Sequence, residues 1–279
     1  WLWTDGVLDR ARARDEMVSA MASWAGDCDS PASCGLAMRR FRQREILRIG
    51  VRDIFKHVPL YSLTQDLSFL ADAALEAALR AIYPVLHERF GRPMYHSRTG
   101  QTREARLGIL GMGKLGGLEL NFSSDIDLIF IHTDDGETEG GTSSAITNEE
   151  FFQKLGEQVI KLVSEQTAEG SIFRVDMRLR PYGRLSPLSI SLPRALDYYE
   201  GCAQAWERQA LLKARPVAGD LVLGGRLIEE AQPFIFPRYF DDETLNSTRE
   251  IKQQMEAQIA ARRETELDVK LGRGGIRDI

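Results

Sequence analysis

Cysteine is scarce in this 279-residue chain, which has only Cys28, Cys34 and Cys202. An odd and sparse set indicates reduced thiols rather than a disulfide framework. Cys28 and Cys34 could form half of a zinc site, but no second pair completes it. The chain also lacks an apolar run of the roughly 20 residues that a membrane span needs, and it shows no secretory-signal pattern. We therefore expect a cytoplasmic protein that does not bind a membrane.

The chain also lacks an excess of basic residues. Its 36 Lys and Arg residues stand against 41 Asp and Glu, which gives a formal net charge of −5. Proteins that follow a nucleic-acid backbone usually carry a basic surface, so this balance disfavours nucleic acid as the partner. Internal repeats and low-complexity tracts are missing as well. The length suffices for about two or three compact units with a substantial core.

What the sequence does contain is an apolar strand, a glycine-rich turn and a second apolar strand in direct succession, over residues 110–131. Glycines in such a turn leave backbone N–H groups free to approach a phosphate. Asp125 and Asp127 follow on the second strand, where residues two positions apart face the same side. Adjacent carboxylates repel each other unless a cation lies between them, and Mg²⁺ prefers oxygen ligands.

A third aspartate stands in residues 171–180, whose apolar residues occupy alternate positions and predict a half-buried strand. Asp176 shares the polar face with three arginines, whose planar guanidinium groups match phosphate geometry. These arginines are Arg174, Arg178 and Arg180. Together with the turn and the paired aspartates, this segment predicts a metal-dependent nucleotidyl-transfer site.

Each feature has a simpler explanation when it is taken alone. An Asp-x-Asp pair can mark a turn or a solvated strand edge, a Gly-x-Gly turn is a weak fingerprint, and strand arginines are most often solvated. The prediction of a site depends on their combination: 11 residues separate Gly113 from Asp125, and a further aspartate stands on a later strand.

The flanking segments predict helices. Residues 36–55 and a segment after Thr64 carry apolar residues at helical spacing. We expect the arginines of the first of these helices to be solvated and salt-bridged, the alternative being that one or two line the nucleotide cleft. Thr147 and Glu150 form a capping box for a helix that reaches about residue 168. The order of elements predicts an α+β fold, with a helical region over 1–103, a catalytic core with a small mixed sheet over 104–190 and a helical region over 191–279.

In the last of these regions we expect Glu207 and Lys213 at the surface or the rim of the cleft, and a long amphipathic helix over 242–267. The chain begins with Trp1 rather than Met, and its last residues stop inside a predicted turn. We therefore expect it to be a piece of a larger protein.

Several stretches match one known family. Residues 111–130 have the sequence Gly-Met-Gly-Lys-Leu-Gly-Gly-Leu-Glu-Leu-Asn-Phe-Ser-Ser-Asp-Ile-Asp-Leu-Ile-Phe. Further matches are Val-Asp-Met-Arg-Leu-Arg-Pro (175–181), Trp-Glu-Arg-Gln-Ala-Leu-Leu-Lys-Ala-Arg (206–215), Val-Lys-Leu-Gly-Arg-Gly-Gly-Ile-Arg-Asp-Ile (269–279) and Phe-Arg-Gln-Arg-Glu-Ile-Leu-Arg-Ile (41–49). These stretches closely resemble the bifunctional glutamine synthetase adenylyltransferase/adenylyl-removing enzymes, a family of the DNA polymerase β-like nucleotidyltransferase superfamily. Leu118 stands where the resemblance leads us to expect Arg, and residues 182–186 depart from the expected loop; both concern the rim of the site.

That family carries two homologous catalytic halves, and the Asn-Phe-Ser-Ser-Asp-Ile-Asp sequence is similar to the N-terminal, adenylyl-removing half. The resemblance implies phosphorolysis of an adenylyl-tyrosine on glutamine synthetase, which yields ADP. It implies Mg²⁺ or Mn²⁺ held by Asp125, Asp127 and Asp176. Phosphate contacts would come from Gly111, Gly113, Lys114, Ser123, Ser124, Arg178 and Arg180. The implied partners are glutamine synthetase, a PII signalling protein, nucleotide and phosphate.

Three alternatives stay open. The chain could be the half that adenylylates glutamine synthetase from ATP, because the carboxylates do not separate the two directions. It could be a nucleic-acid nucleotidyltransferase, which the acidic balance disfavours. It could also be a catalytically idle regulatory or docking domain, although all three aspartates are present.

Overall fold

The structure, a computed structural model, describes residues 6–26, 28–97, 99–183 and 186–237, together with residues 253 and 257. Apart from those two residues, the helix predicted over 242–267 and the sequence match at 269–279 lie outside the described residues.

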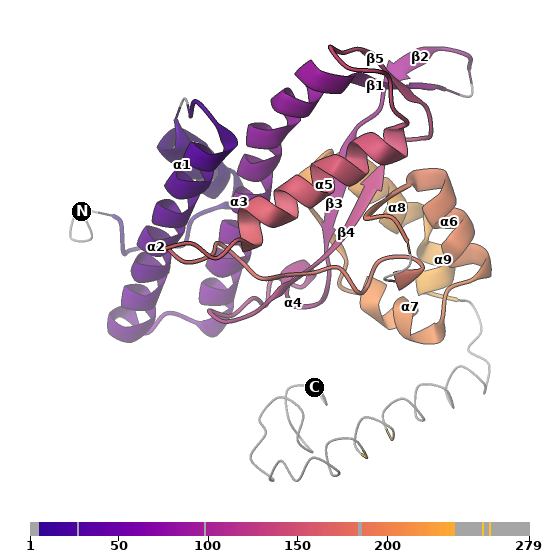
Figure 1. Cartoon of the computed structure of the whole chain (residues 1–279). Coiled ribbons are helices and arrows are strands. Elements are labelled where there is room, and N and C mark those ends of the chain that lie inside the picture. Colours follow the sequence, from indigo (N-terminus) through magenta and orange to yellow (C-terminus); the bar gives the residue numbers. More distant parts are fainter. Residues whose placement is uncertain are drawn as a thin grey trace.

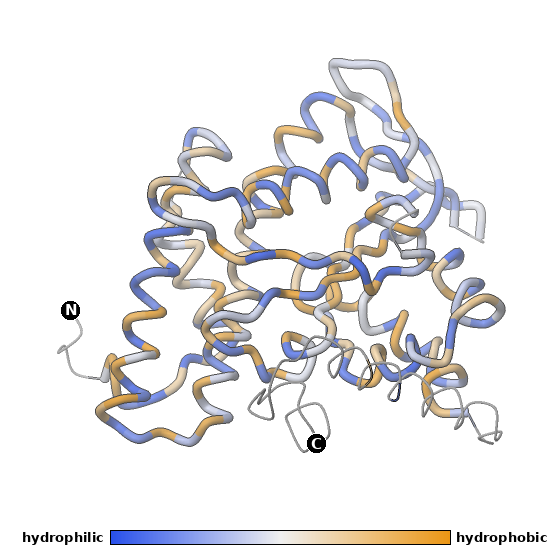
Figure 2. Tube along the Cα trace, turned by 60° about the horizontal axis from the view of Figure 1, so that its bottom comes forward, coloured by the Kyte–Doolittle hydropathy of each residue, from blue (hydrophilic) through white to orange (hydrophobic). Residues whose placement is uncertain are grey.

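Three helices form the N-terminal part: α1 (Arg14–Ala25), α2 (Pro31–Lys56) and α3 (Leu60–Phe90). Ser30 caps α2, because its side chain accepts a hydrogen bond from the Ser33 N–H, and Pro31 occupies the first helical position. His57, in a left-handed conformation, ends α2, and α3 begins after Pro59. The three helices lie side by side (Figure 1), and hydrophilic and hydrophobic residues alternate along them (Figure 2).

Two sheets follow. A small antiparallel sheet has the order β2-β1-β5, from β1 (Gly91–His96), β2 (Thr102–Glu104) and β5 (Glu137–Gly140). The main sheet has the order β6-β4-β3-β8, from β3 (Leu107–Gly111), β4 (Ile126–His132), β6 (Val175–Asp176) and β8 (Arg215–Gly219). In it β3 runs antiparallel to β4 and β8, whereas β6 and β7 (Ser189–Ser191) run parallel to β4. The predicted α+β class with a small mixed sheet is therefore confirmed, and the architecture is consistent with a polymerase β-like core flanked by helices.

The remaining helices complete the described part: α4 (Gly113–Gly116), α5 (Asn148–Ser164), α6 (Leu192–Gly201), α7 (Ala205–Leu211), α8 (Leu221–Glu230) and α9 (Gln232–Ile235). The capping box predicted for α5 is present, since the Thr147 side chain accepts from the Glu150 N–H and the Glu150 carboxylate accepts from the Thr147 N–H. None of the helices within the described residues is long and apolar enough to cross a membrane.

The main sheet separates two hydrophobic cores. Leu128 and Phe130 of β4 pack in the core that includes α3 and α5, whereas Ile129 and Ile131 pack in the core that includes α6 and α8. Because strand residues alternate between faces, Asp127 belongs to the same face as Ile129. The predicted separation of Asp127 from Ile126 and Leu128 is thus confirmed.

Two predicted elements differ from the structure. Residues 171–180 form a strand only at Val175 and Asp176. The Asp176 carboxylate then accepts from the Arg178 N–H at 2.8 Å, and this local turn ends the strand. The region over 1–103, predicted to be helical, also contains β1 and the start of β2. The helix α3 ends at Phe90, and Gly91, with φ +87°, begins β1 so close to the Glu139 carbonyl that a side chain there would strike it.

Two predictions of exposure were wrong. Arg39, Arg48 and Arg52 of α2 are buried, because Asp66 of α3 pairs with Arg48 and Arg52 and the Gly170 carbonyl accepts from Arg39. Their predicted salt bridges are present, and Arg40 is both exposed and paired with Glu169 as predicted. Glu207 is buried as well, and both of its carboxylate oxygens accept from the Tyr198 hydroxyl at 2.8 Å. Lys213 is half exposed, as predicted.

Candidate active site

The glycine-rich turn lies directly against the Asp127 carboxylate. The Met112 N–H donates to the Asp127 carbonyl at 2.9 Å, which holds the turn beside β4. Gly113 follows with φ +51°, a conformation that favours glycine. A Cβ atom on Gly113 would lie 3.1 Å from Oδ2 of Asp127. The backbone of the turn and a carboxylate of the predicted site are therefore neighbours.

The other glycines of the turn serve close packing. A Cβ on Gly111 would lie 2.7 Å from the Val217 side chain, and a Cβ on Gly116 would lie 1.9 Å from the Lys213 carbonyl oxygen. These contacts bring α4 down onto residues 213–217, and Lys114 is half-buried on the same short helix. Phosphate contacts from Gly111, Gly113 and Lys114 stay predictions.

The aspartates come from two adjacent parallel strands. Asp127 of β4 and Asp176 of β6 are register partners, one step beyond the pair formed by Ile126 and Val175. Asp125 lies just before β4, and its side chain is 50% exposed. Segments about 50 residues apart in the sequence thus meet in the main sheet. Their assignment as metal ligands stays a prediction.

Two arginines hold carboxylates of the site. The Arg178 Nε donates to Oδ2 of Asp176 at 2.7 Å, and Arg174 forms an ion pair with Asp125. The hydrogen bond and the charge of Asp176 raise the pKa of Arg178, and the charges of Asp127 and Asp125 raise it further. One guanidinium group therefore lies in the field of all three carboxylates.

Arg180, also predicted as a phosphate contact, bonds to backbone carbonyl oxygens in this structure. The Arg180 guanidinium donates to the carbonyl oxygens of Met177, Ser186 and Pro187, and so closes the loop after β6. A role of Arg180 in neutralising phosphate stays a prediction.

Ser123 and Ser124 belong to a turn organised by Asn121. The Asn121 Oδ1 accepts from the Ser124 hydroxyl at 2.6 Å and from the Ser123 N–H at 3.2 Å. The Ser123 carbonyl in turn accepts from Arg174 at 2.8 Å. Phosphate contacts from the two serines stay predictions. Asn121 was not predicted as a site residue, whereas Arg174 was expected on the polar face of residues 171–180 beside Asp176.

The donor chemistry of the aspartates fits a hard divalent cation, because Asp127 and Asp176 offer carboxylate oxygens from neighbouring strand positions. In the part of the chain that the structure describes, however, no three acidic, histidine or cysteine side chains form a preassembled metal cluster. Asp125 and Asp176 are paired with arginines instead. Binding of Mg²⁺ at these carboxylates stays a prediction.

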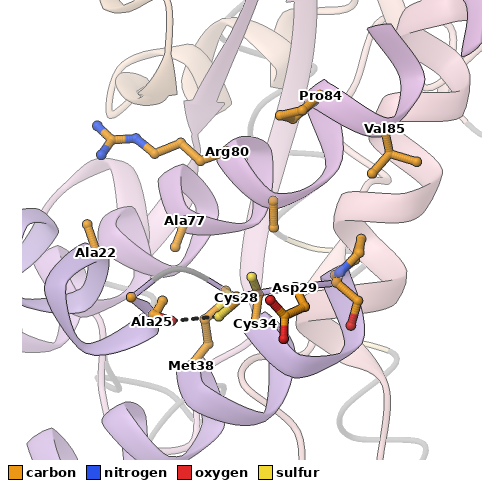
Figure 3. Close-up of a pocket in the computed structure, with 14 residues that line it drawn as sticks. Ala22, Ala25, Cys28, Asp29, Cys34, Met38, Ala77, Arg80, Pro84 and Val85 are labelled. Carbon is orange, nitrogen blue, oxygen red and sulfur yellow. Dashed lines mark hydrogen bonds between the residues drawn. The ribbon is translucent and has the colours of Figure 1, made fainter. Parts of the chain in front are cut away.

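A separate cavity lies among α1, α2 and α3, with a volume of about 490 Å³ (Figure 3). Cys28 and Cys34 both line it, and burial raises the pKa of the Cys34 thiol to about 12. The thiol is therefore protonated at neutral pH. All three cysteines are free in this structure. The zinc alternative gains no support, since the described residues contain no metal-binding cluster.

Comparison with known proteins defines the class of this chain. The family model described as glutamate-ammonia ligase adenylyltransferase matches residues 2–230. The chain therefore belongs to this family, whose members are nucleotidyltransferases.

Relatives named bifunctional glutamine synthetase adenylyltransferase/adenylyl-removing enzyme are similar over almost the whole chain. The protein of Thioalkalivibrio sulfidiphilus is 42% identical over 275 residues, which cover 99% of this chain and 28% of the relative. The protein of Pseudomonas putida is 41% identical over 278 residues, covering 100% of this chain and 28% of the relative. The protein of Pseudomonas aeruginosa is 41% identical over 274 residues, covering 98% and 27%. The chain thus spans little more than a quarter of the length of these relatives.

Proposed function

We propose that this chain carries the adenylyl-removing site of a cytoplasmic, bifunctional glutamine synthetase adenylyltransferase/adenylyl-removing enzyme. The observation that carries the proposal is the placement of Asp127 and Asp176 as register partners, with the Gly113 turn against Asp127. The names of the relatives support glutamine synthetase as the protein substrate. The Asn-Phe-Ser-Ser-Asp-Ile-Asp sequence supports the removing direction.

The reaction is phosphorolysis of the adenylyl-tyrosine. An oxygen of inorganic phosphate attacks the AMP phosphorus and forms the new P–O–P bond of ADP. The bond from phosphorus to the tyrosyl oxygen breaks, and that oxygen takes up a proton. When bound by Asp125, Asp127 and Asp176, Mg²⁺ or Mn²⁺ would neutralise charge on the phosphate oxygens.

The arginines and the turn supply the rest of the binding site. Arg174 and Arg178 are exposed by 69% and 67%, so their guanidinium groups can turn from the carboxylates to phosphate oxygens. The first turn of α4 presents backbone N–H groups at Gly113 and Lys114, where a helix leaves donors without intrahelical partners. A PII signalling protein would regulate the reaction, a part of the proposal that rests on the family resemblance.

The test is incubation of the chain with adenylylated glutamine synthetase, Mg²⁺ and phosphate, followed by analysis of the nucleotides. We expect ADP release that depends on phosphate. Release of AMP without phosphate would mean hydrolysis, and transfer from ATP onto unmodified glutamine synthetase would mean that the chain is the adenylylating half.

A matched pair of variants assigns the activity to the site. We expect Asp127→Asn to lower the rate by on the order of 10²–10³-fold, because it removes a carboxylate ligand of the cation that would neutralise charge on the phosphate oxygens. Its melting temperature should stay normal. Asp53→Asn, at an exposed position of α2, is the control and should keep full activity. An Asp127→Asn variant with normal turnover would contradict the assignment.

A further inference from the structure

Asp72 of α3 is a buried aspartate that the proposed chemistry does not use. Its side chain has no exposed surface. Arg215 of β8 binds it with both ends of the guanidinium group, Nη1 to Oδ2 at 2.7 Å and Nη2 to Oδ1 at 3.0 Å. The Arg14 Nε adds a contact to Oδ2 at 3.1 Å. The two-pronged pairing fixes the orientation of the Arg215 guanidinium group.

Arg215 also contacts the short helix of the candidate site. Its Nη2 donates to the Leu115 carbonyl of α4 at 3.2 Å. In the sheet, Arg215 is the register partner of Gly111, the last residue of β3 before the turn. Gly116 of the same helix packs closely on the Lys213 carbonyl. The position of α4 therefore depends on residues 213–215.

The helix α4 in turn determines where Gly113 lies. Gly113 is its first residue, and a Cβ there would lie 3.1 Å from Oδ2 of Asp127. A continuous set of contacts thus runs from Asp72 through Arg215 and the Leu115 carbonyl to the turn beside Asp127. It joins the N-terminal helices to the candidate site.

We propose that Asp72 and Arg215 are positioning residues, which hold α4 where the Gly113 turn can meet a phosphate next to Asp127. The catalytic part of this inference rests on the proposed function. The placement of α4 does not, because it can be measured in the protein without substrate. Neither side chain contacts substrate in this scheme; Asp72 acts through Arg215, and Arg215 acts through the backbone of α4.

The same helix offers a matched control for Asp72. Asp66 of α3 is equally buried and is also paired with two arginines, Arg48 and Arg52. It further accepts from the Arg12 N–H at 2.9 Å. Its partners come from α2 and from the segment before α1, whereas Asp72 pairs with Arg215 of β8. Asp66→Asn therefore removes a buried charge from α3 without removing an anchor of α4.

The experiment compares amide hydrogen exchange of residues 113–119 in the ligand-free wild type, Asp72→Asn and Asp66→Asn. The amides of Gly116, Gly117 and Glu119 donate within the turn and report its order. We expect their exchange to be about tenfold faster in Asp72→Asn than in Asp66→Asn, measured at equal distance below each melting temperature. Equal protection in the two variants would overturn the proposal.

A second variant covers the case in which Asp72→Asn fails to fold. Arg215→Lys keeps a positive charge for Asp72 but loses the planar fork that reaches both Asp72 and Leu115. We expect faster exchange of residues 113–119 in this variant with little change in the rest of the chain. Unchanged exchange in Arg215→Lys would also overturn the proposal.

The last measurement is the enzymatic activity of the variants. For phosphate-dependent ADP release, we expect Asp72→Asn and Arg215→Lys to lower kcat by about 10–100-fold, because a small misplacement of binding groups has effects of this size. Asp66→Asn should keep a normal kcat below its melting temperature. If the wild type released no ADP, the proposed function would fail, whereas the exchange data would still decide the role of Asp72 and Arg215.

Discussion

Aspartates pair with arginines both in α3 and in the candidate site, but the arginines are buried in the first region and exposed in the second. Asp66 has no exposed surface, and its partner Arg48 is 1% exposed. Asp176 is 15% exposed, but its partner Arg178 is 67% exposed. Breaking the buried pair leaves a charge without water, whereas Arg178 can leave Asp176 and be solvated at once. The burial of the arginine is therefore the difference between the two kinds of pair: Arg48 stays with Asp66, whereas Arg178 can leave Asp176.

This difference suits the two regions to different tasks. Pairs of the first kind hold α1, α2, α3 and β8 together. Under the proposed function, pairs of the second kind would keep the site carboxylates neutralised until a cation takes the place of the guanidinium group and the guanidinium group binds a phosphate. The comparison predicts that the same substitution has unequal effects in the two regions.

The largest expected effect is on the buried pair. We expect Arg48→Met to lower the free energy of unfolding by about 3–5 kcal/mol, because Glu45 and Asp66 lose a buried partner. Arg178→Met should lower it by no more than about 1 kcal/mol, since the guanidinium group that is lost is solvated. Urea denaturation of the two variants measures the difference. Similar losses in both would break the distinction between the two kinds of pair.

A smaller effect is expected where the turn meets Asp127. Gly113→Ala should lower the free energy of unfolding by about 1–2 kcal/mol, because alanine is strained at φ +51°. It should also lower the rate of ADP release, since the new methyl group would press on the Asp127 carboxylate.

Gly225→Ala in α8 is the control for that change. Its added Cβ would meet no atom within 4 Å, so this variant should be slightly more stable and fully active. Thermal denaturation and nucleotide analysis check both variants. A Gly113→Ala protein with wild-type activity would show that the close approach to Asp127 is not required.

The smallest effect is expected at a fully solvated pair. The hydrogen bonds of Arg10 and of the Ala13 N–H lower the pKa of Glu16 from its ordinary value of 4.5 to about 2. A lowered pKa means that this interaction stabilises the protein above pH 4.5 and is lost as the pH falls toward 2. Arg10→Ala should therefore raise the pKa of Glu16 toward 4.5, as measured by NMR titration. A Glu16 pKa still near 2 in the variant would assign the shift to the Ala13 N–H instead.

Local patterns in the sequence predicted much of this molecule. The capping box at Thr147 and Glu150 placed the start of α5 correctly, although the helix ends at Ser164 rather than near 168. The strand pattern predicted that Asp127 faces the other side of the sheet from Ile126 and Leu128, which the structure confirms. The pairing of Asp176 with Asp127 is seen in the structure. The first two features depend on neighbours within a few residues, and strand and helix periodicity record such neighbours directly.

The errors occurred where distant segments meet. The arginines of α2 have the spacing of a solvated face, but Asp66 on the next helix lies against Arg48 and Arg52 and draws them inside. The alternation of residues 171–180 suggested a long strand, but β6 pairs with β4 at only two positions before the Asp176 carboxylate accepts from the Arg178 N–H. The burial of Arg48 and Arg52 and the extent of pairing between β6 and β4 depend on segments that a local pattern does not show.

The sequence by itself determined the mixed α+β class and the two strand segments that carry the aspartates, because hydrophobic periodicity and turn residues act locally. Only the tertiary structure decided which charges are buried and which helix supports the turn. The contact between Asp72 and Arg215 joins residues 143 positions apart, and packing of α3 against β8 creates it. A buried pair of charges is stable only when folding excludes water and supplies both partners together, so its existence depends on the whole chain.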